Sequence, residues 1–361
     1  MTEELPARRA MHVQRDDPSV TELVDESPPT LGDGQALLRV DVVGLSANNV
    51  TYAVLGEQFH YWDFFPAPAP WGEVPVWGFG EVVASKHPDL DVGRRFYGYY
   101  PSASHLVVTP DPGHPVGFKE VSQHRAHLPS PYNTYDDVAD DHIDDAHLEH
   151  LHALYRPLFW TSFMLADRVI DTDPEEKSLV VMTSASSKTA YITAFLLHRA
   201  GRRVVGLTSA RNVAFTNALR VYDEVLTYDD VTHLAAEPTT VLDFLGDDDV
   251  DATLSEHLGE DHSRVIVGVT GQVAGPDWTL EAIATEAVFF APTQMKRRLV
   301  DWGREELERR YQEAWTTFVA EADGFVDVVV ASGLDALQDG WHEIQAGRVD
   351  PRDGMVFTLG T

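Results

Sequence analysis

The chain has 361 residues and a formal net charge of −31, because 58 acidic side chains outnumber 27 basic ones. Such a negative field repels nucleic acid and anionic lipid, so neither is an expected partner. The absence of cysteine excludes disulfides, a thiolate nucleophile and any zinc site built on cysteine.

The length suits two domains, each with its own core. No uncharged apolar run is long enough to span a membrane, and the N-terminus lacks the apolar segment of a signal peptide, so a cytoplasmic location is expected. The acidic, lysine-poor composition is typical of proteins from a salt-rich cytoplasm, where ions screen self-repulsion. The alternative is a merely acidic protein from an organism that prefers arginine.

Short strands dominate the first third of the chain. Apolar patterns predict strands over residues 35–43, 74–84, 95–100 and 106–109. With glycine and proline between them, these strands indicate a small, partly open β-barrel. Residues 110–152 are rich in Asp, His and Pro, and we expect an elaborated surface segment that ends in a helix beginning near Asp144.

A helix over residues 157–170 is predicted to lead into a second domain. Residues 178–230 then read as strand, small-residue turn, helix, strand, polar turn, helix and strand. This order is typical of one half of a doubly wound, parallel dinucleotide-binding sheet of the Rossmann type, which gives an α/β fold class. A long helix over 305–322 and strands over 326–331 and 355–359 are predicted to close the chain.

The turn after the strand at 179–182 is the expected phosphate site, because a helix that begins there offers unpaired N–H groups and a positive dipole end. The usual glycines are replaced by small polar residues and a lysine, whose hydroxyls and charge could replace some lost contacts. The alternative for the lysine is a solvated position in the first helical turn. The expected contacts are Ser184, Ser186, Ser187, Lys188 and Thr189.

The end of the second strand indicates which nicotinamide dinucleotide is bound. An acidic residue there would accept from the ribose hydroxyls of NAD and repel a 2′-phosphate. The chain instead has Ser209, Arg211 and Asn212, and a guanidinium can bind a phosphate in bidentate fashion. NADP(H) is therefore the predicted cofactor; Arg211 as an ordinary surface residue is the alternative.

Five segments carry a resemblance to the medium-chain dehydrogenase/reductase superfamily, in particular its zinc-free quinone oxidoreductase and enoyl reductase branches. They are residues 34–46, 92–98, 222–228, 241–246 and 341–357. The resemblance implies a GroES-like barrel domain over 1–155 and 305–361 and a Rossmann domain over 156–304. Phe79 stands where the zinc enzymes carry a histidine ligand, so no metal is expected.

The resemblance implies hydride transfer from NADPH to an activated alkene or quinone, in which the enolate oxygen needs hydrogen-bond donors. Asn49 and Tyr52, in the loop after the first long strand, are the candidates for substrate orientation and for oxygen polarisation or proton donation. Simple packing of the tyrosine is the alternative. Candidate substrate contacts, for which packing is again the alternative, are Tyr61, Trp62, Phe65, Trp160 and Thr161.

Gly246 and Thr270 are also predicted to contact the cofactor, and a homodimer is expected through residues 287–290. His147, His150 and His152 have a spacing similar to metal ligands, but we expect a solvated helix face instead. The alternative to an enzyme is a catalytically idle NADP(H)-binding sensor or partner subunit, because the glycine turn is altered.

Overall fold

The structure is a computed structural model that describes residues 5–111, 113, 116–138, 145–175, 177–267 and 288–360. The predictions for Asp144, Thr270 and Ala287 lie outside the described residues. The chain divides into two compact units. Unit 1 comprises Met1–Tyr155, Val328–Val349 and Asp353–Thr361, and unit 2 comprises Arg156–Asp327 and Asp350–Arg352.

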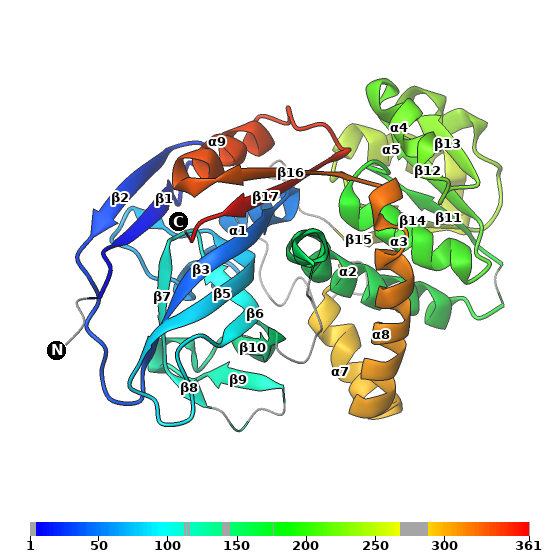
Figure 1. The fold of residues 1–361 in the computed structure, drawn as a ribbon. Coiled ribbons are helices and arrows are strands. Elements are labelled where there is room, and N and C mark those ends of the chain that lie inside the picture. The colour runs from blue at the N-terminus through cyan, green and yellow to red at the C-terminus, as the bar shows by residue number, and fades with distance from the viewer. Residues whose placement is uncertain are drawn as a thin grey trace. The chain divides into compact units, whose positions relative to one another are not determined.

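Unit 1 is built on antiparallel sheets (Figure 1). One sheet has the order β2-β1-β4, and a nine-stranded sheet has the order β16-β17-β3-β5-β6-β10-β9-β8, with β7 paired to β3. The strands are β1 (Arg8–Gln14), β2 (Thr21–Glu26), β3 (Ala36–Leu45), β4 (Trp71–Gly72), β5 (Pro75–Ser85), β6 (Arg95–Pro101), β7 (His105–Val108), β8 (Pro110–Asp111), β9 (Gly117–Glu120), β10 (Thr134–Asp137), β16 (Asp327–Ser332) and β17 (Asp353–Thr358). The predictions for β3, β5, β6, β7, β16 and β17 are confirmed to within two residues, whereas β1 and β2 were not predicted.

The helical elements of unit 1 are short apart from one. They are α1 (Ala47–Val54), η1 (Tyr61–Asp63), η2 (Gln123–Arg125), η3 (Ser130–Asn133) and α9 (Gly333–Gln345). The expectation of a loop after β3 is wrong, because residues 47–54 form α1. Ser46 and Asn49 make a capping box that starts this helix.

The prediction that residues 110–152 form a surface segment is also wrong for the residues described there. Strands β8, β9 and β10 extend the nine-stranded sheet. Phe118 and Tyr135 are fully buried and stack with ring centroids 4.8 Å apart, and Arg125 is buried as well. Because the segment is polar in composition, strands β9 and β10 were not recognised in the sequence. Their alternate side chains complete the core of unit 1.

Helix α2 (Ala146–Thr172) is one continuous helix in which Pro157 is an interior residue. Separate helices before and after this proline were expected, because an interior proline costs roughly 3 kcal/mol. Leu154 and Tyr155 before it, and Leu158 and Phe159 after it, are all buried. Burial of these side chains on both sides of the proline offsets that cost.

Unit 2 contains a parallel sheet with the order β13-β12-β11-β14-β15, connected by helices (Figure 1). This order, with β11 first in sequence and central, is that of a doubly wound sheet, so the predicted fold class is confirmed. The elements are β11 (Leu179–Met182), α3 (Lys188–Arg199), β12 (Val204–Thr208), η5 (Ala210–Asn212), α4 (Val213–Ala218), β13 (Glu224–Thr227), η6 (Tyr228–His233), β14 (Thr239–Asp243), α5 (Asp248–Leu258), η7 (Gly259–Asp261) and β15 (His262–Ile266).

Beyond β15, Val288 makes a parallel bridge to Ile266. The predicted dimer contact through this segment stays a prediction. Helices α7 (Ala291–Asp301) and α8 (Arg304–Val319) and η8 (Ala322–Gly324) follow. The compact division assigns α8 to unit 2, so the chain returns to unit 1 near residue 328 rather than at residue 305.

The aromatic contacts of α8 are consistent with this division. Its residues Trp315 and Phe318 pack against Phe159, and Phe318 also packs against Phe195 of α3. Within the described part of the chain, no helix is both long and apolar enough to cross a membrane.

A close approach between β3 and α2 within unit 1 predicts a costly substitution. A Cβ atom on Gly44 would lie 2.4 Å from the carbonyl oxygen of Ala153, which is backbone and cannot rotate away. We expect Gly44→Ala to lower the free energy of unfolding by about 1–3 kcal/mol in urea denaturation. Gly324→Ala is the control, because nothing lies within 4 Å of a Cβ there. Equal stability of the two variants would contradict the close approach.

Candidate cofactor site

The turn after β11 lies against the neighbouring strand β12. The N–H of Ala185 donates to the carbonyl of Leu207 at 2.9 Å, and the hydroxyl of Tyr222 donates to the carbonyl of Ala185 at 2.8 Å. Gly206 of β12 permits this approach, because a Cβ there would lie 2.8 Å from the Cβ of Ala185. The turn itself has no glycine, but Gly206 in the neighbouring strand allows the turn and the strand to approach closely.

Ser184 turns the chain with a left-handed backbone angle (φ 49°), a conformation for which glycine is usual. Its N–H donates to the hydroxyl of Tyr228 at 2.9 Å, which ties the turn to the end of β13. Burial raises the pKa of Tyr228 to about 12, so the phenol stays protonated at neutral pH. Ser184 therefore has a clear role in shaping the turn.

Ser187 is the N-cap of the 12-residue helix α3, but its side chain makes no capping hydrogen bond there. Its hydroxyl is buried and has no hydrogen-bond partner among the residues that the structure describes. A buried hydroxyl without a partner is costly unless a ligand or water satisfies it. The start of α3 therefore combines a positive dipole end with a buried hydroxyl, a pair that suits a phosphate.

The end of β12 holds a second such hydroxyl. Ser209 Oγ is buried and has no hydrogen-bond partner within the described part of the chain, and Arg211 is exposed two residues further on. Asn212 Nδ2 donates to Ser186 Oγ at 3.0 Å, and Thr208 Oγ1 lies 3.4 Å from the same atom. Ser186 and Asn212 thus join the two turns that carry Ser187 and Ser209.

Two predicted phosphate contacts have partners inside unit 2. Lys188 Nζ donates to the carbonyl of Pro351 at 3.2 Å, which fixes the lysine near the start of α3. The carbonyl of Thr189 accepts from Ser162 Oγ and from Thr193 Oγ1. Neither observation tests a contact with a nucleotide.

Asp243, at the end of β14, is a central residue of this edge that the sequence reasoning did not select. Its Oδ1 accepts from Thr183 Oγ1 at 2.7 Å and from the N–H groups of Leu245 and Gly246, while Arg264 binds Oδ2. Burial opposes ionisation of this carboxyl, but these donors together hold its pKa below the ordinary value. Gly246 (φ 65°) closes the turn around it. The signal was the aspartate of the motif over 241–246.

The candidates for catalysis lie in unit 1, on α1. Asn49 is buried, and both ends of its amide are used: Oδ1 accepts from the N–H of Ser46 and Nδ2 donates to the carbonyl of Pro75, each at 2.9 Å. Tyr52 is buried and its oxygen accepts from Trp77 Nε1 at 3.1 Å. Burial raises the pKa of Tyr52, so it stays a neutral phenol.

The predicted aromatic substrate contacts are packed within their own units. Tyr61, Trp62, Phe64 and Phe65 are buried in unit 1. Tyr61 packs on Tyr52 with ring centroids 4.7 Å apart, and the two phenylalanines contact Tyr99.

In unit 2, Trp160 packs against Tyr311 of α8 at 4.8 Å, and Thr161 Oγ1 donates to the carbonyl of Pro157 at 3.4 Å. These contacts are what the packing alternative predicts, and the role in substrate binding stays a prediction.

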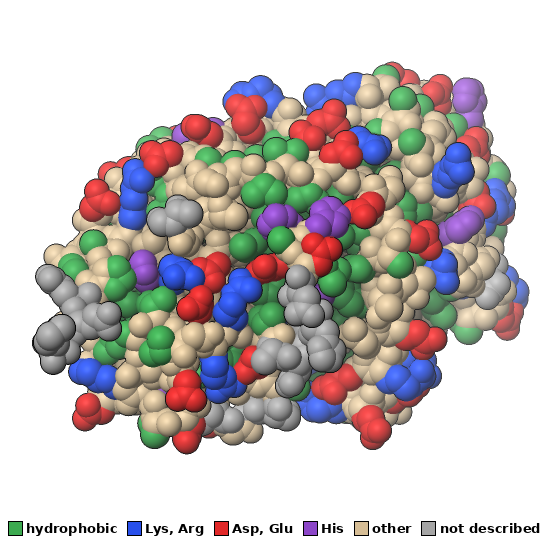
Figure 2. All heavy atoms as spheres, in the orientation of Figure 1, with side chains coloured by type: hydrophobic (Ala, Val, Ile, Leu, Met, Phe, Trp, Pro, Cys, Tyr) green, Lys and Arg blue, Asp and Glu red, His purple; other side chains and the backbone are tan. Residues whose placement is uncertain are grey.

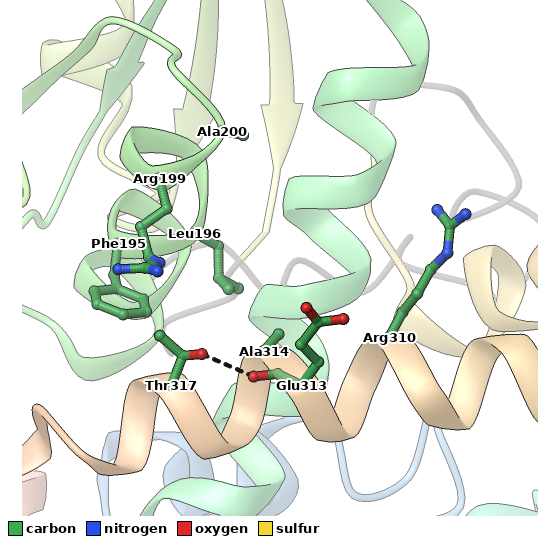
Figure 3. Close-up of a pocket in the computed structure, with 8 residues that line it drawn as sticks. All are labelled: Phe195, Leu196, Arg199, Ala200, Arg310, Glu313, Ala314 and Thr317. Atoms are coloured by element: carbon green, nitrogen blue, oxygen red, sulfur yellow. Dashed lines mark hydrogen bonds between the residues drawn. The ribbon is translucent and has the colours of Figure 1, made fainter.

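A cavity of about 320 Å³ lies elsewhere in unit 2, between α3 and α8 (Figure 3). Arg199 extends over the ring of Phe195 at its rim, and Thr317 donates back to the carbonyl of Glu313. The α3 residues that line it are in the last turn and the C-cap, whereas Ser187 is at the other end of the helix. The cavity is therefore separate from the candidate phosphate site.

A family described as a protein of unknown function (DUF2855) matches residues 43–350, which is most of the sequence. The chain belongs to this family. No curated protein matches the sequence.

Solved structures show the fold. CurA from Vibrio vulnificus is 15% identical, with a TM-score of 0.60 over 98% of this chain and 99% of that chain. The quinone oxidoreductase from Coxiella burnetii is 17% identical, with a TM-score of 0.55 over 98% and 100%. The yhdH oxidoreductase from Salmonella enterica, in complex with NADP, is 15% identical, with a TM-score of 0.53 over 97% and 99%. The resemblance to the medium-chain dehydrogenase/reductase fold is confirmed.

The network around Asp243 predicts a pH-dependent contribution to stability. Because its folded pKa lies below the unfolded value of about 3.9, its contribution is complete above that value and is lost as the pH falls through the folded pKa. We expect Asp243→Asn to lower the free energy of unfolding by about 1–3 kcal/mol at pH 7. The difference from the wild type should shrink below about pH 4. A difference that is constant from pH 7 to pH 3 in urea denaturation would contradict the assignment.

Proposed function

We propose that this protein is an NADP(H)-dependent oxidoreductase that transfers hydride to an activated alkene or quinone without zinc. The observation that carries the proposal is a pair of buried hydroxyls, those of Ser187 and Ser209, at the carboxyl edge of a doubly wound sheet, neither of which has a partner among the described residues. In such sheets ligands bind outside the carboxyl ends of the strands. Two similar structures are complexes, CurA from Vibrio vulnificus with NADPH and the yhdH oxidoreductase from Salmonella enterica with NADP.

The residues at this edge fit NADP(H). The start of α3 and the Ser187 hydroxyl would hold the diphosphate. Ser209 and the exposed Arg211 would hold the 2′-phosphate, and residues 208–212 contain no acidic side chain that would repel it. Asn212 would act through Ser186, to which it is hydrogen-bonded. When bound, NADPH supplies a hydride.

Tyr52 keeps its proposed role in unit 1, whereas Asn49 is assigned a positioning role in place of direct substrate orientation. Because Trp77 donates to the Tyr52 oxygen, the phenol can direct its own hydrogen to a further acceptor. A neutral phenol in a buried setting would stabilise an enolate oxygen as a hydrogen-bond donor. Asn49 would act by fixing the start of α1, since both ends of its amide are already used.

The hydrogen bonds that hold Asn49 to the backbone of Ser46 and Pro75 also favour the second candidate function, an NADP(H)-binding sensor or partner subunit with no turnover. The two functions separate in one assay, in which NADPH oxidation is followed with a panel of enones, quinones and enoyl thioesters at high salt. Turnover of any member supports the reductase. Tight NADPH binding with no turnover across the panel would favour the sensor.

Cofactor selectivity can be tested at Arg211. We expect Arg211→Ala to weaken NADPH binding about tenfold or more in calorimetry and to leave NADH binding unchanged, because only NADPH carries the 2′-phosphate. Arg203→Ala is the matched control, since Arg203 is exposed and precedes the opposite end of β12. An equal loss of affinity for NADPH and NADH, or unchanged affinity for NADPH, would contradict the proposed contact between Arg211 and the 2′-phosphate.

The role of Tyr52 can be tested by removing its hydroxyl. We expect Tyr52→Phe to lower kcat by about 10²-fold with NADPH affinity unchanged, because a single oxyanion donor is worth that much. Tyr100→Phe is the control: this buried tyrosine of unit 1 donates only to the carbonyl of Phe96 among the contacts described. If both variants keep wild-type kcat, Tyr52 has no direct role.

A further inference from the structure

Three side chains that the proposed function does not use converge on the surface of unit 1. His60 Nδ1 lies 3.0 Å from Asp63 Oδ2, and His127 Nε2 lies 3.5 Å from the same oxygen. The three candidate ligand atoms all lie within 4.8 Å of one another. Sixty-four residues of sequence separate His127 from Asp63, so the fold brings this group together and spacing along the chain could not reveal it.

We propose that His60, Asp63 and His127 bind one divalent transition-metal ion of the Zn²⁺ class. Two atoms that each lie about 2.0–2.2 Å from zinc at a tetrahedral angle are about 3.4 Å apart. The two distances to Asp63 lie on either side of that value. Both pairs that include Asp63 Oδ2 are therefore close to the spacing that one bound ion requires.

The donor set selects the class of metal. Two imidazoles and one carboxylate suit zinc, nickel and copper, whereas magnesium and calcium prefer shells made of oxygen. The side chains are between 44% and 57% exposed, so water can complete the coordination. Acidic side chains are dispersed over the visible face of the molecule (Figure 2), and with a net charge of −31 this field favours cations.

The segments that carry the ligands are anchored by buried neighbours. Tyr61 and Trp62, beside His60, are buried, and His60 itself has a left-handed backbone (φ 59°). On the other segment, Arg125 is buried with its guanidinium 4.6 Å from the ring of Phe65, and Leu128 is buried after His127. Exposed ligands on anchored segments lose little entropy when a metal binds.

A second group within ligand distance is His12, Glu26 and Glu73, also in unit 1. Arg8 donates to both of these carboxylates, so a guanidinium already occupies the place of a cation. His147, His150 and His152 belong to no such group within the described ranges of the chain. Of the two groups, the one at Asp63 is therefore suited to a metal.

The test is calorimetric titration of the chelator-treated full chain with Zn²⁺. We expect one site per chain, and His60→Gln and His127→Gln should each weaken binding at least tenfold, since each removes a ligand. His233→Gln is the matched control: His233 also pairs with an aspartate three residues away, Asp230, but has no third ligand. This variant should bind Zn²⁺ as the wild type does.

Thermal unfolding gives an independent readout. Zn²⁺ should raise the Tm of the wild type and of His233→Gln, but not that of His60→Gln or His127→Gln. Millimolar Mg²⁺ should not displace the ion. The proposal is overturned if no stoichiometric binding is seen, or if both ligand variants bind as the wild type does. Because all three ligands lie outside the edge that would hold NADPH, NADPH binding should be unchanged in every variant, which separates a failure here from a failure of the proposed function.

Discussion

The carboxyl edge of the parallel sheet depends on one interaction, the hydrogen bond from Thr183 to Asp243. Thr183 directly follows β11 and Asp243 is the last residue of β14, so the bond joins the two strands where their turns begin. The Thr183 oxygen also accepts from the N–H groups of Phe244 and Leu245. The turn after β11 also packs against β12, where the absence of a side chain at Gly206 leaves room for Ala185.

This packing against β12 explains how a turn without the usual glycines could still bind a dinucleotide. In the common fingerprint, glycines within the turn let the backbone approach the diphosphate. Here the close approach between turn and strand is made at Gly206, and Ser184 takes the left-handed conformation with its N–H held by Tyr228. The hydroxyls of Ser187 and Ser209 have no partner in the part of the chain that the structure describes. Polar side chains thus occupy the positions from which backbone groups would otherwise bind phosphate.

The sequence predicted the parts of the fold that periodic apolar residues determine. The strands β11 and β12 and the long helix α8 are within three residues of their expected bounds. The prediction failed where composition misled it: Phe118 and Tyr135 are buried in strands inside a polar segment, and Pro157 is interior to α2. The alternation is too short to see in a four-residue strand, and tertiary burial overrides the preference of a single proline.

In the candidate site, too, some residues could be predicted from the sequence and others could not. The turn residues from Ser184 to Ser187 could be predicted because they follow a recognisable strand, but Asp243 could not, since its role depends on Thr183, 60 residues away. The cluster around Asp63 is a similar case, because its third member comes from a distant turn. Sequence spacing shows the contacts within one element, whereas contacts between elements need the fold.

A crystal structure of the protein grown with NADP⁺ at high salt would show directly whether this edge holds the cofactor. We expect density for the diphosphate at the start of α3, within hydrogen-bond distance of Ser187, and for the 2′-phosphate beside Ser209 and Arg211. A nucleotide bound elsewhere, or an adenosine ribose turned away from Arg211, would contradict it.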